Sequence, residues 1–491
     1  MKVVFIYPRE MDNYSHPLGI LYIASYLEKE GHKVKVIDNS LKDSIHDIAL
    51  AACKKTPDII GISAATSQIN MAIDIAREIK KISHIPIMIG GIHPTIMPYE
   101  TAANGCFDYI IVGEGEHTTS ELLRAIQTNK EPKNIKGLLY KKNGKLIFTG
   151  HRPLIEDLDS LPPPARHLLA EDAYFAPPKI RAFWANRTAN MMVSRGCPYG
   201  CIFCSNHLMF GRKVRFRSPE KIMEEIKDLK LKYNIDSLRF DDDTFTTNKE
   251  WAIKFCRLLR KLCKDNGWKA FRWTCQTRVN TVTPEVLLEM KKAGCGEIDF
   301  GVESGSPRML KILEKGITVE QVIKAFDMTR RFGILRGGTF IVGTPGETEA
   351  DLRLTERLVK RIRPDFADFF FATPYPKTKL WEIAKEKGFK ELVPYSQWFT
   401  AKITDKPVMC ISMAEERMIY WRSRLHNLNW LRDYAHLARD PRFFFGGLKF
   451  AVLGYRGIVP GLKRVIKTGK IDSLLVETLH SYRLRLKKSV V

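Results

Sequence analysis

Residues 191–204 read Met-Met-Val-Ser-Arg-Gly-Cys-Pro-Tyr-Gly-Cys-Ile-Phe-Cys, a short apolar run followed at once by three cysteines. The run Met191–Ser194 predicts a buried strand, so the cysteines fall on the loop that leaves it. Parallel strands of β/α units carry functional groups on the loops at their C-terminal ends. The stretch therefore predicts a parallel α/β fold with chemistry on its first loop.

The alternation of strand and helix continues for about 180 residues beyond this loop. Ser218-Pro219-Glu220 predicts the first helix start, with a serine cap and proline at the first helical position. Five further strands are expected at Ser237–Asp241, Phe271–Thr277, Glu297–Val302, Thr339–Gly343 and Phe366–Thr373. Six β/α units predict a partial TIM-type (β/α)6 barrel over residues 186–400.

A second α/β pattern precedes the barrel, with amphipathic helices expected at Leu18–Glu30 and Ile69–Lys81. Strands are expected at Val3–Tyr7, Lys33–Ile37, Ile59–Ser63, Ile85–Gly90 and Tyr109–Val112. Continuous Val/Ile runs are typical of strands buried on both faces, which predicts a doubly wound, flavodoxin- or Rossmann-like sheet of five parallel strands in residues 1–135. Residues 136–185 are expected to form a hairpin turning at Asn143-Gly144 and a proline-rich linker.

Composition and charge exclude several classes of protein. The 491 residues carry a net charge of +24, and residues 401–491 hold 18 basic and 7 acidic side chains, against 18 and 16 in residues 1–150. No signal peptide, membrane-spanning run or disulfide framework is apparent, which predicts a cytoplasmic protein. Residues 401–491 are expected to be helical and basic.

The three cysteines predict a metal cluster. Cys197, Cys201 and Cys204 offer three thiolates, which can bind three irons of a 4Fe-4S cluster and leave the fourth iron open to a small molecule. Two alternatives remain. The cysteines could be half of a zinc site, although the other seven form no second tight pair, or they could be buried thiols.

The triad, with an aromatic residue before its last cysteine, resembles the radical S-adenosylmethionine superfamily, and the preceding sheet resembles the cobalamin-binding domain of one of its large classes. The resemblance covers about residues 1–400. Supporting motifs follow successive strands: Asp241-Asp242-Asp243-Thr244-Phe245, Gly301-Val302-Glu303-Ser304-Gly305 and Phe340-Ile341-Val342-Gly343-Thr344-Pro345-Gly346.

The resemblance implies that the three cysteines hold the cluster and that its open iron chelates S-adenosylmethionine. Phe203 would then pack by the adenine, Gln276 and Glu303 would hydrogen-bond the ribose, and Arg278 would meet the methionine carboxylate; for each polar residue, an ordinary hydrogen bond at the barrel rim is the alternative. Ser304 and Ile341 join this set as cofactor-binding candidates. The three aspartates are expected to make local loop contacts and to cap a helix start, with one of them approaching the adenosine or the substrate.

Cobalamin is the third cofactor that the resemblance implies. The signature of a histidine ligand to cobalt does not occur in residues 1–130, so no such ligand is proposed. The candidates for binding the cofactor lie at strand ends, where glycines permit close approach and hydroxyls can hydrogen-bond: Ser63, Thr66, Gly90, Gly91, His93, Gly113, Glu114 and Gly115. A degenerate domain that binds no cobalamin is the alternative. The related methylthiotransferases need three N-terminal cysteines, whereas residues 1–150 contain only Cys53 and Cys106.

The resulting hypothesis is that the protein is an enzyme, a radical methyltransferase. It would make a 5′-deoxyadenosyl radical and transfer a methyl group from methylcobalamin to an unactivated carbon. One alternative is an oxidative cyclase or rearrangement enzyme resembling the anaerobic porphyrin-ring cyclase. Another is a cobalamin- or redox-responsive binding protein without catalysis.

The expected partners are an unidentified organic substrate and an electron donor such as flavodoxin or ferredoxin. Around Phe443–Phe450 and Val465–Lys467, apolar residues alternate with basic ones, as in segments that settle on anionic bilayers. This pattern suggests contact with the inner face of the membrane and a lipid, isoprenoid or anionic substrate. A helical cap on the barrel is the alternative, and no motif supports nucleic-acid binding.

Overall fold

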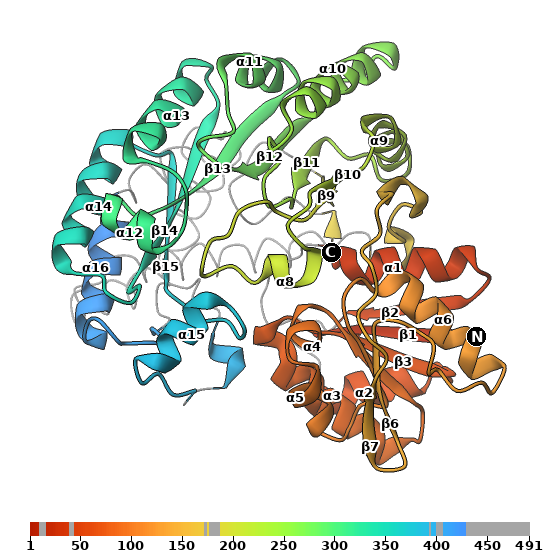
Figure 1. Cartoon of the computed structure of the whole chain (residues 1–491). Helices are drawn as coiled ribbons and strands as arrows, with labels where there is room; N and C mark the ends of the chain where they lie inside the picture. The colour runs from red at the N-terminus through yellow and green to blue at the C-terminus, as the bar shows by residue number, and fades with distance from the viewer. Residues whose placement is uncertain are drawn as a thin grey trace, which may run out of the picture. The chain divides into compact units, whose positions relative to one another are not determined.

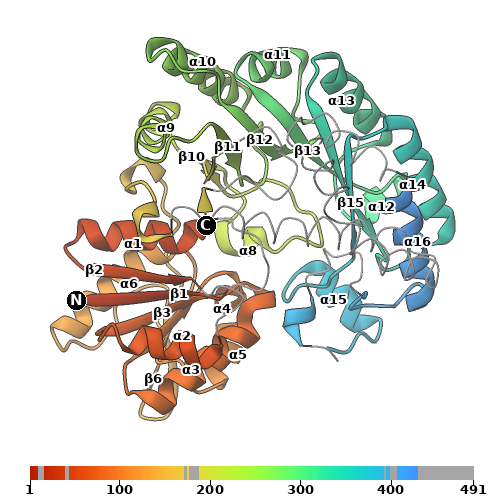
Figure 2. The same ribbon diagram turned by 180° about the vertical axis from the view of Figure 1, so that it is seen from behind.

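The computed structural model describes residues 1–8, 16–38, 44–170, 174–175, 187–391, 394–398 and 406–428. They lie within one compact unit, Met1–Asn429. This unit contains two α/β sheets, one from the first third of the chain and one from the residues after 187 (Figures 1 and 2). Most of the expected basic C-terminal region, including Phe443–Phe450 and Val465–Lys467, lies outside the described residues.

The N-terminal sheet has the strand order β2-β1-β3-β4-β5-β6-β7, and β1 to β5 run parallel. Its strands are β1 (Lys2–Tyr7), β2 (Lys33–Asp38), β3 (Ile59–Ser63), β4 (Ile87–Gly90), β5 (Tyr109–Ile111), β6 (Leu138–Lys142) and β7 (Lys145–Phe148). The helices between them are α1 (Leu18–Lys29), α2 (Ile45–Cys53), α3 (Ile69–Ile82), α4 (Ile92–Ile96), α5 (Pro98–Ala103) and α6 (Gly115–Gln127).

Both faces of this sheet are covered, as the continuous apolar strands predicted. In β1, Val3 and Phe5 pack in the core that contains residues of α1 and α6, whereas Val4 and Ile6 pack in the core that contains residues of α2 and α3. Successive side chains of a strand point to opposite faces, so a strand between two helical layers must be apolar throughout. The doubly wound fold is confirmed.

The hairpin adds two strands that the five-strand prediction did not include in the sheet. It turns at Asn143 and Gly144, whose φ values of +47° and +78° are those of a tight hairpin turn. Its first strand, β6, pairs antiparallel with β5, so the sheet has seven strands instead of five. In a five-strand sheet β5 would be an edge strand with unpaired backbone N–H and C=O groups. The first strand of the hairpin pairs with these groups, which adds two strands to the sheet.

The second sheet contains six parallel strands in the order β15-β14-β13-β12-β11-β8. Its strands are β8 (Thr188–Met191), β11 (Ser237–Phe240), β12 (Arg272–Thr277), β13 (Cys295–Glu303), β14 (Leu335–Val342) and β15 (Phe366–Phe371). The larger helices are α9 (Pro219–Tyr233), α10 (Lys249–Asp265), α11 (Pro284–Lys292), α13 (Val319–Arg331), α14 (Glu349–Ile362) and α16 (Glu415–Asn427); the shorter ones are α8 (Asn206–Phe210), α12 (Pro307–Ile312) and α15 (Lys379–Glu386). Six strands with outer helices confirm the partial barrel.

The first barrel strand differs from the prediction. β8 ends at Met191, where the expected strand begins, and the chain then forms the two-residue strand β9 (Ser194–Arg195), which pairs antiparallel with β10 (Arg215–Phe216). The side chain of Asp242 causes the break, because it accepts hydrogen bonds from the backbone N–H groups of Val193 (3.0 Å) and Ser194 (2.6 Å). These two donors are thereby turned away from the parallel sheet.

Helix α16 is the described part of the expected helical C-terminal region. Met418, Trp421 and Leu425 are buried in the barrel core, and Met418 fills the space beside Gly343 at the end of β14. None of the helices in the described ranges is long and apolar enough to cross a membrane.

Candidate active site and cofactor cavity

The cysteine loop joins β9 to α8 and is held at its start. Gly196 has a φ of +96°, and a Cβ there would lie 2.3 Å from the carbonyl oxygen of Lys213, so the close approach requires glycine. The Ser194 hydroxyl donates to Asp242 (2.7 Å), in addition to the two backbone bonds to this carboxylate. Burial raises the pKa of Asp242 to about 7, against the lowering effect of these hydrogen bonds. The carboxylate thus fixes the direction in which the chain enters the loop.

The three loop thiols are close enough to affect one another electrostatically. Cys201 is buried, and Cys197 and Cys204 are half-buried. Burial raises the pKa of Cys204 to about 11, and Asp243 and the other two thiols add to the shift, so ligation by a cation is what would favour the thiolates. Within the described residues, no three Cys, His, Asp or Glu side chains converge on a single metal ion. A cluster makes a different demand, because each thiolate binds its own iron.

Arg278, which follows β12, contacts the cysteine loop. Its Nη1 donates to Cys201 Sγ (3.6 Å), its Nη2 donates to the Lys315 carbonyl, and its guanidinium lies 3.6 Å from the centre of the Tyr199 ring. The expected role was a contact with the methionine carboxylate. In the structure this arginine lies against a cysteine of the triad.

Glu303, at the end of β13, pairs with a lysine that the sequence analysis did not identify. Lys315 Nζ lies 2.6 Å from Glu303 Oε1 and 5.8 Å from the centre of the Phe203 ring. Both members of the pair are buried, and Glu303 has a φ of +67°, a strained value that suggests a functional constraint. The spacing of Glu303 and Lys315 in the sequence does not indicate that they pair. The one local feature at Lys315 is the glycine that follows it in the turn between α12 and α13.

The other expected barrel residues divide into two groups. Gln276 has an exposed side chain at the end of β12, where its carbonyl accepts a hydrogen bond from the Phe245 N–H. Phe203 and Ile341 pack on an apolar cluster that includes Ile202 and Leu313. Gln276, Phe203 and Ile341 therefore border the end of the barrel where the cysteine loop lies.

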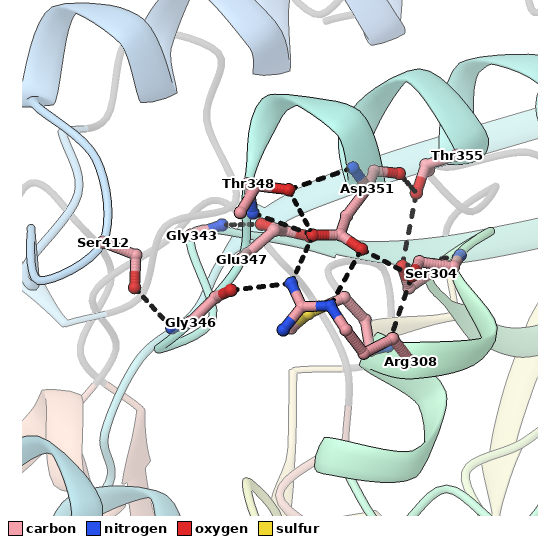
Figure 3. A network of polar contacts seen from close by, with 11 residues as sticks. Ser304, Arg308, Gly343, Gly346, Glu347, Thr348, Asp351, Thr355 and Ser412 are labelled. Carbon is pink, nitrogen blue, oxygen red and sulfur yellow. Dashed lines mark hydrogen bonds and ion pairs between the residues drawn. The ribbon is translucent and has the colours of Figure 1, made fainter.

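Ser304 belongs to a polar network that joins the residues after β13 and β14 to the first turns of α14 (Figure 3). Its hydroxyl contacts Thr355 (3.3 Å) and accepts from the Ser306 N–H, while Asp351 accepts from Ser306 and Arg308. In the same network Glu347 accepts from the Gly343 N–H (2.6 Å), and burial raises the pKa of Glu347 to about 8. The side chain of Ser304 thus joins β13 to α14.

The three aspartates make the loop contacts that were expected. Asp241 accepts from Asn190 (2.7 Å), and Asp243 accepts from Asn206 on α8. The expected helix capping is wrong, because Asn248 caps α10 by accepting from the Trp251 N–H (2.9 Å). The aspartates instead join the ends of β8 and β11 to the cysteine loop and α8.

A cavity of about 690 Å³, which includes space open to solvent, lies at the C-terminal ends of the strands of the N-terminal sheet. Six of the eight residues expected to bind cobalamin line it: Ser63, Gly90, Gly91, Gly113, Glu114 and Gly115. Gly91 has a φ of +103°, and a Cβ there would lie 2.7 Å from the Ala64 carbonyl oxygen. Where these glycines line the wall, backbone rather than a side chain faces the cavity, which allows a large cofactor to approach closely. The backbone wall of glycines and the Ser63 hydroxyl are groups that fit the cobalamin this domain implies.

Thr66 and His93 lie outside this cavity lining. His93 is buried, contacts the Thr66 hydroxyl (3.4 Å) and packs edge-on against the Tyr395 ring at 5.1 Å. Burial lowers the pKa of His93 to about 4, which keeps the ring neutral. Thr66 and His93 thus lie just after β3 and β4, at the strand ends where they were expected, and they contact each other.

The cavity wall also includes residues that lead into the cysteine loop, namely Met192 and Arg195. Arg195 bridges two carboxylates of the N-terminal domain, with Nη1 2.8 Å from Glu114 and Nη2 2.7 Å from Glu116. Glu114 also accepts from Arg215 (2.9 Å), and all four side chains are buried. Although burial raises the pKa of Glu114, the arginines hold it below its ordinary value. The Glu114 carboxylate therefore holds the barrel against the cofactor domain, a role that the sequence analysis missed.

Comparison with known proteins gives matches in both domains. The model of the Radical SAM superfamily matches residues 191–359, and the model of the B12 binding domain matches residues 7–123. The chain is 39% identical over 394 residues to an uncharacterized methyltransferase of Pyrococcus horikoshii, which covers 78% of this chain and 83% of that protein. It is 29% identical over 405 residues to the anaerobic magnesium-protoporphyrin IX monomethyl ester cyclase of Rubrivivax gelatinosus, which covers 79% of this chain and 70% of that protein.

A solved structure with a similar fold is the radical S-adenosylmethionine methyltransferase TsrM from Kitasatospora setae, with cobalamin and a 4Fe-4S cluster bound. It matches with a TM-score of 0.66 and 20% identity, covering 80% of this chain and 76% of that chain. The sheet and the partial barrel thus occur in the same order in a solved protein.

Proposed function

Because the chain belongs to the radical SAM superfamily, in the group that carries an N-terminal B12-binding domain, we propose that it transfers a methyl group to an unactivated carbon of an organic substrate. Its cofactors are a 4Fe-4S cluster, S-adenosylmethionine and cobalamin, and an external reductant supplies electrons. When bound, the cluster and S-adenosylmethionine supply a 5′-deoxyadenosyl radical, and cobalamin carries the methyl group.

One observation carries the proposal: a single segment, residues 192–204, supplies both a wall of the cofactor cavity and the cysteine triad. Met192 and Arg195 line the cavity, and Cys197 follows Arg195 by two residues. A methyl transfer to a substrate radical requires the two reactive centres to meet at one substrate, because such a radical must be intercepted before it reacts elsewhere. The shared segment supports this convergence.

The residues of the barrel end support binding of S-adenosylmethionine beside the triad. Lys315 fixes the Glu303 carboxylate, and a fixed carboxylate is suited to accept hydrogen bonds from ribose hydroxyls. Phe203 offers an apolar surface for the adenine, and buried Ile202 and Leu313 exclude water from below the loop. We propose Cys197, Cys201 and Cys204 as the cluster ligands.

A valine or leucine at Gly90 is predicted to separate the two halves of the reaction. Gly90 lines the cavity, and a Cβ there would meet Ile111 at 3.5 Å, an ordinary contact, so the backbone accepts a side chain that we expect to occupy part of the cavity. We expect Gly90→Leu to weaken cobalamin binding at least about 100-fold, which is about 2.7 kcal/mol. The reduced protein should still form 5′-deoxyadenosine from S-adenosylmethionine but no S-adenosylhomocysteine.

The matched control is Gly296→Leu, a strand glycine of the barrel with comparable room and no part in the cavity. Cobalamin retention is measured by absorbance after gel filtration, and both products by mass spectrometry. Wild-type protein that forms deoxyadenosine alone, with candidate substrate present, would contradict methyl transfer and favour the cyclase chemistry that the Rubrivivax relative's name indicates.

We further propose a lipid or isoprenoid substrate and peripheral contact with an anionic membrane. The support is the alternation of apolar and basic residues in Phe443–Phe450 and Val465–Lys467 and the surplus of 18 basic over 7 acidic residues in 401–491. The full chain should float with vesicles containing anionic lipid, and a chain ending near residue 435 should not. Equal flotation of both chains would remove this proposal.

A further inference from the structure

Arg278 is a buried cation whose guanidinium is fixed by four contacts. Only 4% of the residue is exposed. Nη1 donates to Cys201 Sγ at 3.6 Å, Nε donates to Asn280 at 3.3 Å, Nη2 donates to the Lys315 carbonyl, and the plane lies 3.6 Å from the centre of the Tyr199 ring. An arginine held in this way cannot swing toward solvent.

The charge of Arg278 has no carboxylate partner in the described part of the chain, where its acceptors are a carbonyl, an amide and a sulfur. The nearby Glu303 carboxylate is paired with Lys315 instead. A buried charge without a counter-charge is costly, so a fold that keeps one usually supplies an anion. A thiolate-ligated cluster on Cys201 would be that anion, and it becomes more negative when it gains an electron.

We propose that Arg278 raises the reduction potential of the cluster by donating a charge-assisted hydrogen bond to the Cys201 sulfur. The inference rests on the proposed function, since it requires the cluster on the triad. Hydrogen bonds to ligand sulfurs and nearby charge set the potentials of iron–sulfur clusters. The step is a one-electron reduction by an external donor with no proton transferred, and the buried cation stabilises its more negative product. Arg278 is thus a positioning and tuning residue beside the cluster.

The test is the midpoint potential of the reconstituted cluster, measured by an anaerobic titration followed by electron paramagnetic resonance. Without S-adenosylmethionine, Arg278→Met should lower the midpoint potential of the cluster by about 59 mV. At a fixed applied potential, this corresponds to a ratio of reduced to oxidised cluster that is about tenfold lower. Arg278→Lys, which keeps the charge but loses the planar fork, should lower the ratio about threefold. If Arg278→Met takes up no cluster, the lysine variant decides the question.

The matched control is Arg212→Met. Arg212 is exposed and lies against Gly200 of the same loop, so its charge is screened by water and the ratio should change less than twofold. Potentials of the Arg278 variants equal to that of the control would overturn the inference. Weaker binding of S-adenosylmethionine at an unchanged potential would also overturn it, because Arg278 would then be a cofactor contact alone. Absence of a cluster in the wild-type protein would instead count against the proposed function.

Discussion

Cys201→Ser is expected to abolish cleavage of S-adenosylmethionine, with deoxyadenosine formed at less than about one thousandth of the wild-type rate. Loss of an outer hydrogen-bond partner of a metal site costs about 10–100-fold, so loss of a direct ligand should cost more. Cys201 is the most buried thiol of the triad and accepts the Arg278 hydrogen bond, which makes it the ligand least open to replacement by water. Iron and sulfide content and the deoxyadenosine rate are measured on protein reconstituted anaerobically.

Cys410→Ser provides the control, because Cys410 is exposed and distant from the triad in sequence. Its iron content and activity should equal those of the wild type. A Cys201→Ser protein with a full cluster and more than about one tenth of the wild-type rate would exclude this thiol as a ligand.

Arg195→Met is expected to destabilise the protein by about 3–5 kcal/mol, the usual cost of removing one partner from a buried ion pair. The change leaves Glu116 without the guanidinium at 2.7 Å and Glu114 with Arg215 and the Ile155 N–H as its remaining donors. It also replaces one of the side chains that line the cofactor cavity, so cobalamin retention should fall together with stability. The free energy of unfolding is measured by urea denaturation of cofactor-free protein.

Lys213→Met is the comparison for this variant. Lys213 pairs with Glu156 in the same region, but both side chains are largely exposed, and the loss should stay within about 1 kcal/mol. If Arg195→Met were no less stable than Lys213→Met, the buried network would not be what holds the barrel to the cofactor domain.

Local sequence pattern was sufficient for most of the fold. The apolar runs predicted both sheets because a strand between two helical layers must be apolar on both faces, and Asn143-Gly144 predicted the hairpin because few residues accept its backbone angles. The pairing of that hairpin with β5 was not predicted, since an edge strand carries no local mark of its partner. The early end of β8 was missed for a similar reason: it depends on Asp242, about 50 residues further along.

In the candidate site, too, features that depend on one residue were predicted, and contacts between residues distant in the sequence were not. Glycines at strand ends predicted the cavity wall, because close approach of backbone to a ligand is a property of each glycine alone. The pairs Arg195–Glu114 and Lys315–Glu303 and the contact of Arg278 with Cys201 join side chains that are 81, 12 and 77 residues apart. Their charges are ordinary in the sequence, and only the fold makes them buried partners.

The central claim is that the triad and the glycine-lined cavity serve one methyl transfer, and transfer of an isotopic label tests it most directly. Reconstituted protein holding cobalamin is reduced and mixed anaerobically with S-adenosylmethionine labelled in its methyl group, and the protein-bound cobalamin is then isolated. We predict that label appears on cobalamin, with an equal amount of S-adenosylhomocysteine, in the wild type and not in Gly90→Leu. Deoxyadenosine formed by a wild-type protein whose cobalamin stays unlabelled would contradict the claim.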